Sequence, residues 1–134
     1  MKKGIIIWIL VCILIPLRSQ NLIGLPKEVI YSELLKEYPT FVRDNTFVNH
    51  SYNYLKYIDK VDEQTLLIFL SDQNICTSTK LICDYSELNS IKLKLKKYKQ
   101  ISKDKWMYSK NGKTYFIRLK REEWFFSLFT SLKS

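Results

Sequence analysis

Apolar residues recur at helical spacing in the segment 25–38, LPKEVIYSELLKEY. Ile30, Leu34 and Tyr38 are four residues apart, so a helix would place all of them on one side. The Pro and Glu near the start of the segment are residue types favoured in a first helical turn. The pattern predicts a helix over this segment, followed by a polar loop.

Three strand-like runs come next along the chain. They are 52–58 (YNYLKYI), 65–70 (TLLIFL) and 75–83 (ICTSTKLIC), separated by the polar sequences DKVDEQ and SDQN. Short runs rich in β-branched and aromatic residues, bounded by Asp, Asn and Ser, are typical of strands joined by turns. These runs predict a three-stranded antiparallel meander.

Two patterns compete in the segment 84–99, DYSELNSIKLKLKKYK. Residues 91–96 alternate between apolar and charged types, as in a strand. However, Asp84 followed three residues later by Glu87 resembles a capping box, and apolar residues then recur at helical spacing. These residues are Leu88, Ile91, Leu95 and Tyr98. We predict a helix, because an alternating six-residue strand would leave the first half of the segment unexplained.

The last third of the chain contains a hairpin signal, Asn111-Gly112, between two strand-like runs. Both residue types accept the positive φ angles of a type I′ turn, which fixes the strand register. The turn pairs Lys110 with Lys113, Tyr108 with Tyr115 and Trp106 with Ile117. A four-residue loop at 120–123 (KREE) would then lead to a third strand. That loop would pair Leu119 with Trp124, Ile117 with Phe126 and Tyr115 with Leu128.

The predicted fold class is α+β, with two successive helix-plus-three-stranded antiparallel meander units packed as one small domain. The units cover about 25–84 and 85–131, and the domain covers 21–134. The core face of the second unit carries the large apolar side chains that the two hairpins place opposite one another.

The first 20 residues have the organisation of a secretory signal peptide. Lys2 and Lys3 precede the apolar run 5–14, which is shorter than the roughly 20 residues that cross a bilayer as a helix. We predict cleavage near Ser19 or Gln20, a secreted or periplasmic location, and no transmembrane span in the mature chain. Lipidation of Cys12 is disfavoured, because a valine precedes it where the lipoprotein peptidase requires a small residue.

The chain is basic, with a formal net charge of +9. Lys92, Lys96 and Lys99 would form one stripe on the second predicted helix, either as a solvated face or as a surface attracted to anionic lipid or glycan. The sequence argues against a nucleic acid partner, because export would separate the protein from most nucleic acid and the aromatic residues lie in strands patterned for a core.

Catalytic and metal-binding signatures are weak. His50 is the sole histidine, and the chain has no glycine-rich phosphate loop. Cys76 and Cys83 lie in one strand-like run, which would hold their sulfur atoms about 23 Å apart on opposite faces, so we expect two buried thiols; a disulfide would need a turn between them. The sequence predicts no catalytic residue, no cofactor and no metal site, and a small exported enzyme of unknown type stays an alternative.

Three phenylalanines share the predicted sheet face opposite the core. Phe116, Phe125 and Phe129 would lie near Arg118, which the predicted register places directly across from Phe125. Either the second helix or the first sheet covers this face, or the four residues form an aromatic patch for a protein partner, with Arg118 as its polar group.

A resemblance adds to this picture. The segment 23–38, IGLPKEVIYSELLKEY, together with the element order, is similar to helix-plus-β-meander modules of the β-lactamase inhibitor protein and of the small SmpA/OmlA outer-membrane lipoproteins. This chain has Leu25-Pro26 where those modules usually have Ser or Thr after the glycine. The ending PLRSQ (16–20) resembles signal peptides of Bacteroidota, and the chain resembles small exported proteins of that group whose role is uncharacterised. The resemblance implies an exported, non-catalytic binding or interaction protein.

Overall fold

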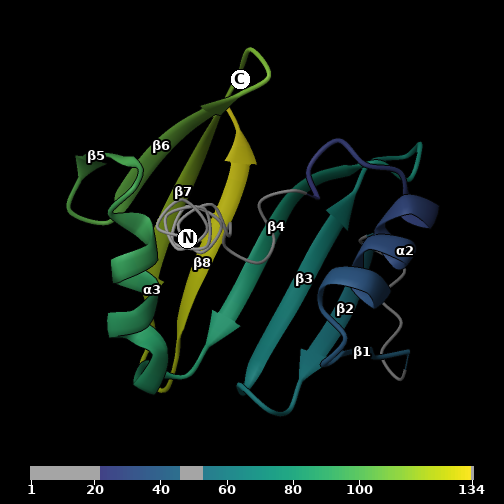
Figure 1. Cartoon of the computed structure of the whole chain (residues 1–134), viewed down its shortest axis with the longest axis horizontal. Coiled ribbons are helices and arrows are strands. Elements are labelled where there is room, and N and C mark those ends of the chain that lie inside the picture. The colour runs from purple at the N-terminus through teal and green to yellow at the C-terminus, as the bar shows by residue number, and fades with distance from the viewer. Residues whose placement is uncertain (1–21, 46–52, 134) are drawn as a thin grey trace, which may run out of the picture.

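The computed structural model describes residues 22–45 and 53–133, which form one eight-stranded antiparallel sheet and two short helices (Figure 1). The helices are α2 (Lys27–Glu37) and α3 (Leu88–Leu95), and a 3-10 turn, η1 (Tyr85–Glu87), leads into α3. The strands are β1 (Phe41–Arg43), β2 (Tyr54–Asp59), β3 (Gln64–Leu70), β4 (Cys76–Cys83), β5 (Lys99–Ser102), β6 (Lys105–Lys110), β7 (Lys113–Arg121) and β8 (Phe126–Leu132).

The strands follow the order β1-β2-β3-β4-β8-β7-β6-β5 across the sheet. Each helix is therefore followed by four strands that run in sequence from one edge of the sheet to its centre. There, β4 pairs with β8 and joins the two halves. The prediction of two helix-plus-three-stranded units is wrong, because two further strands are present and all eight form a single sheet.

The two strands absent from the prediction lie at the edges of the sheet. β1 has three residues, too few to display an alternating pattern. β5 has the sequence KQIS and is exposed at every position, so no buried face imposes apolar alternation on it. The helical pattern was also extended too far, since α3 ends at Leu95 and Lys99 already belongs to β5.

The other predicted elements are confirmed. α2 occupies most of 25–38, and β2, β3 and β4 correspond to the three predicted runs of the first half. The segment after β4 is helical, as the capping pattern indicated. The Asp84 carboxylate accepts a hydrogen bond from the Ser86 backbone N–H at 2.9 Å and so caps η1.

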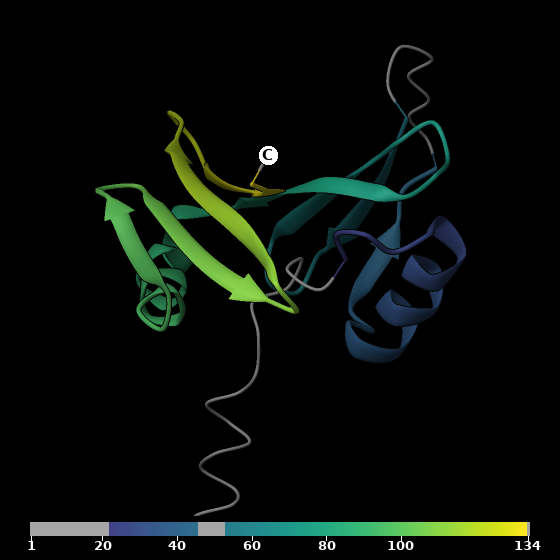
Figure 2. The same ribbon diagram turned by 90° about the horizontal axis from the view of Figure 1, so that it is seen from above.

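The hydrophobic core lies between the helices and one face of the sheet. Figures 1 and 2 show both helices on this side of the sheet. Ile30 and Leu34 of α2 and Ile91 and Leu95 of α3 are buried there. The strands contribute the alternating residues Leu55, Tyr57, Leu66, Ile68, Leu81, Trp106, Ile117, Leu119, Phe126 and Leu128.

The β6–β7 hairpin has the predicted register, and Asn111 and Gly112 have φ angles of 53° and 76°. The predicted β7–β8 register is wrong. β7 continues to Arg121, so the turn lies two residues farther along the chain, at 122–125, where the Glu122 N–H donates a hydrogen bond of 2.9 Å to the Phe125 carbonyl. The observed pairs are Leu119 with Leu128, Ile117 with Thr130 and Tyr115 with Leu132. Trp124, predicted in the core face, is 80% exposed in this turn.

Candidate binding surface

The second face of the sheet has neither helix on it (Figure 2). We call it the open face and define it by the strand residues that alternate with the core residues. Among the described residues it includes several half-buried apolar side chains. They are Tyr54, Ile58, Leu67, Phe69, Ile82, Met107, Phe116 and Phe129. The interpretation that the second helix or the first sheet covers this face is wrong, because α3 packs on the core side and the strands of both halves form a single sheet.

Cations and aromatic rings alternate at one end of the open face. Phe116, Arg118 and Phe129, three residues of the predicted aromatic patch, line a hollow of about 100 Å³ together with Lys105 and Ser131. The Lys105 Nζ lies 4.2 Å from the centroid of the Phe116 ring, and the Arg118 Cζ lies 5.7 Å from that of Phe129. Both distances are in the range of cation–π contacts.

The fourth predicted residue, Phe125, is not part of this hollow. It lies in the turn between β7 and β8, and Arg118 pairs with Phe129 instead. The error follows from the assumed loop at 120–123, which shifted the pairing of β8. Lys105 was not predicted as a member of the patch, although the confirmed register of the β6–β7 hairpin already placed it across from Arg118.

A row of residues crosses the open face from β6 to β2, and we call it the central row. Its members are directly paired from strand to strand. They are, in spatial order, Lys105, Arg118, Phe129, Lys80, Leu67 and Lys56. At the end of the row, the Lys56 Nζ lies 3.4 Å from an Asp44 carboxylate oxygen. Charged and apolar side chains thus share one line across six strands.

The predicted lysine stripe is divided between two faces. Lys92 on α3 and Lys96 just after it line a hollow of about 380 Å³, with Lys103 as a third cation beside them. The hollow is completed by Tyr98, Gln100 and Trp106. Lys99 lies in β5 and is paired with Met107, so it belongs to the open face.

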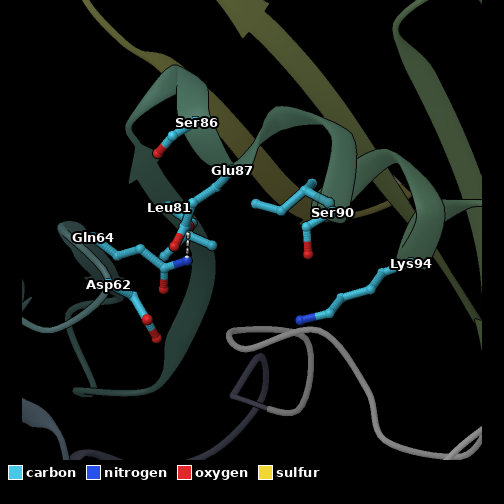
Figure 3. A pocket seen from close by; sticks show the side chains of 8 residues that line it. Asp62, Gln64, Leu81, Ser86, Glu87, Ser90 and Lys94 are labelled. Atoms are coloured by element: carbon cyan, nitrogen blue, oxygen red, sulfur yellow. Dashed lines mark hydrogen bonds between the residues drawn. The ribbon is translucent and has the colours of Figure 1, made fainter.

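A polar pocket of about 270 Å³ lies between the β2–β3 turn and α3 (Figure 3). Asp62 and Gln64 line it from one side, and Glu87 and Lys94 from the other. The Gln64 amide donates a hydrogen bond to the Glu87 carboxylate, which ties β3 to η1. Leu81, Ser86, Ser90 and Ile91 complete the lining.

Both described cysteines are buried in the core, and no disulfide joins them. The prediction of two buried thiols is confirmed, but the prediction of opposite faces is wrong. Leu70 pairs with Cys76 and Phe69 with Ser78, so Thr77 is an extra residue that turns Cys76 toward the core side. Burial raises the pKa of the Cys76 thiol to about 12, which keeps it protonated at neutral pH.

The signal peptide, Cys12 and His50, which the sequence analysis considered, lie outside the described residues. Within 22–45 and 53–133, no three His, Cys, Asp or Glu side chains are grouped as metal ligands would be. The same residues include no helix with the length and apolar composition needed to cross a membrane.

Comparisons with known proteins give no match to a family model, a curated protein or a solved structure. The resemblance to the β-lactamase inhibitor protein and to SmpA/OmlA modules therefore stays a prediction.

Proposed function

We propose that this protein is an exported, non-catalytic binding protein that holds a macromolecular partner on the open face of its sheet. The observation that carries the proposal is the composition of that face. Rings and aliphatic side chains there are half-buried within the sheet, while both helices cover the other side. A broad face with apolar residues at its centre and cations among them is suited to a large partner.

The hollow around Arg118 supplies the anchor of this surface. Phe116 and Phe129 form its apolar walls, and Lys105 and Arg118 lie over the two rings. Interface residues with the largest energetic effect are often aromatic residues and arginines that a partner shields from water. Arg118 is exposed in the isolated chain, so a partner would remove it from water on binding.

Export is part of the proposal and is supported by the sequence alone. The lysines at positions 2 and 3 and the apolar run 5–14 have the order of a signal peptide. Cleavage near Ser19 or Gln20 would release the chain into the periplasm or the medium.

The proposal is tested by photo-crosslinking in producing cells. A benzophenone amino acid replaces Ser78, which pairs with Phe69 on one side and Ser131 on the other, in the middle of the open face. A second variant carries the same group at Lys36, an exposed residue in the last turn of α2. Because benzophenone reacts with C–H bonds of peptides and sugars alike, we expect a high-mass adduct from position 78 and none from position 36.

The adduct must also depend on the proposed anchor. Arg118→Ala and Phe129→Ser, each combined with the crosslinker at position 78, should greatly reduce it without changing the circular dichroism spectrum. Equal adducts from positions 78 and 36, or an adduct that both anchor variants leave intact, would show that the open face is not the binding surface.

A further inference from the structure

The charged residues at the described strand positions of the open face are all cations. No Asp or Glu occupies an open-face position on any of the eight described strands. The cations there are Lys56, Lys80, Lys99, Lys105, Arg118 and Lys120. Two of these cations have an acidic neighbour beyond a strand end, because Asp44 lies 3.4 Å from the Lys56 Nζ and Glu122 lies 3.2 Å from the Lys120 Nζ. The other described acidic residues lie in turns, in helices or, like Asp59, on the core side. This separation of charge favours a partner with many negative groups.

The central row gives these charges a regular spacing. Neighbouring strands are about 4.8 Å apart, so cations on alternate strands are about 10 Å apart. Arg118 on β7, Lys80 on β4 and Lys56 on β2 are placed in this way, with Phe129 and Leu67 on the intervening strands. From β7 to β2, apolar contact and positive charge therefore alternate along a line perpendicular to the strands, and Lys105 adds a second cation beside Arg118 at the β6 end.

An extended acidic peptide does not fit this spacing. Its side chains on one face recur every second residue, or about 6.6 Å. An extended polysaccharide has sugar units about as long as one interstrand distance. When acidic and neutral sugars alternate, a carboxylate meets every second strand of the sheet, and the apolar face of the neutral sugar meets the strand between.

The rings in this region also argue against stacked nucleic acid bases. Base stacking requires aromatic rings with an accessible face. The Phe116 ring has the Lys105 ammonium 4.2 Å from its centroid, and the Phe129 ring has the Arg118 guanidinium over it. In this arrangement the cations cover the ring faces, so the surface presents positive charge and not an aromatic ring.

We propose that the open face binds a linear acidic polysaccharide with a carboxylate on every second sugar, lying across the strands along the central row. The inference rests on the proposed function and names the chemical class of its partner. Arg118 and Lys80 contact successive carboxylates. Lys56 contributes less, because Asp44 already lies 3.4 Å from its ammonium group.

The test measures the affinity of the purified protein for a fluorescent hyaluronan decasaccharide by anisotropy. Hyaluronan has one carboxylate on every second sugar. An oligogalacturonate with the same number of carboxylates has one on every sugar, and a polyglutamate and an oligothymidylate complete the set of probes. We expect the hyaluronan probe to bind most tightly at physiological ionic strength.

Variants with matched charge changes locate the site. Lys80→Ala should weaken hyaluronan binding by about fivefold, as expected for one lost charge pair of about 1 kcal/mol. Lys36→Ala on α2 removes the same charge from the helix side and should have no effect. Asp44→Asn should strengthen binding by releasing Lys56, whereas Glu37→Gln on α2 should not. Circular dichroism confirms that each variant is folded.

Each other outcome overturns the inference. Equal losses in Lys80→Ala and Lys36→Ala would indicate attraction to net charge alone, and tighter binding of another probe would assign the surface to that class of polymer. If hyaluronan fails to bind while the crosslinker at Ser78 still captures a partner through Arg118, this inference fails and the proposed function stands. If the crosslink is absent as well, both fail.

Discussion

Arg118 and Phe129 are directly paired across β7 and β8, with the guanidinium carbon 5.7 Å from the ring centroid. Phe129 is adjacent to Leu128 in sequence, yet the two side chains lie on opposite faces, because successive residues of a strand alternate. Leu128 and Phe126 belong to the core, whereas Phe129 belongs to the open face. The same strand thus supplies both the core and the candidate binding surface.

Phe126 on the core face and Phe129 on the open face should contribute differently to the free energy of unfolding. Phe126 is fully buried and packs against Tyr85, with ring centroids 5.8 Å apart. Phe126→Ala should lower the free energy of unfolding by about 3–5 kcal/mol. Phe129→Ala, at a half-buried position, should cost only about 1–2 kcal/mol. Urea denaturation of the two variants checks this, and equal costs would mean that the open face is as well buried as the core.

The folded protein should become more stable when the hydroxyl of Thr79 is removed. Thr79 is fully buried on β4, and its Oγ1 has no hydrogen-bond partner among the described residues. Thr79→Val keeps the shape and replaces the unsatisfied hydroxyl with a methyl group, so we expect a gain of about 1 kcal/mol. Thr79→Ser keeps the hydroxyl and removes a methyl group, so it should cost about 1 kcal/mol. A loss of stability in Thr79→Val, measured by urea denaturation, would show that the hydroxyl is satisfied in solution.

Local patterns in the sequence predicted the elements with a buried face. α2 and α3 show helical spacing because Ile30, Leu34, Ile91 and Leu95 pack on the sheet, and the Asn111-Gly112 turn set one register correctly. β1 and β5 left no such pattern, since one is too short and the other is fully exposed. The pairing of β4 with β8 joins segments far apart in sequence, so no local pattern encodes it.

The candidate surface likewise could be predicted only where it depends on local sequence. Phe116, Arg118 and Phe129 were predicted to share a face, because alternation along a strand is local information. Phe125 was assigned wrongly because the register of β8 depends on the position of the turn, which lies at 122–125 and not at 120–123 (KREE). The central row could not be predicted at all, since it requires the order of all the strands from β6 to β2.

Cys76 should make the folded protein less stable at alkaline pH. Its pKa is about 12 in the fold, because burial disfavours the thiolate, and close to the ordinary value of 9.0 when unfolded. Since the folded pKa is the higher one, stability is complete below pH 9 and is lost as the pH rises toward 12. The slope from this thiol is about 1.4 kcal/mol per pH unit.

Urea denaturation of the wild type and of Cys76→Ala, repeated from about pH 8 to about pH 11, isolates this thiol. The variant should show a shallower decline above pH 9. Above pH 10 both proteins should decline further, because burial also raises the pKa values of Tyr57 and Tyr108 from their ordinary value of 10.0. Parallel curves for the two proteins would mean that Cys76 ionises in the fold as easily as in the unfolded chain.

The intact mass of the protein from periplasm, outer membrane and medium tests export and the state of the thiols together. A signal peptide predicts a chain that begins at Gln20 or Asn21. Because no disulfide joins Cys76 and Cys83, iodoacetamide under denaturing, non-reducing conditions should add two alkyl groups to this chain. Native alkylation should be slow, since both thiols are buried and that of Cys76 has a raised pKa. A mass with an intact N-terminus would contradict export by cleavage, a lipidated mass beginning at Cys12 would replace secretion with a membrane anchor, and a chain that resists alkylation until it is reduced would contradict the arrangement of β4.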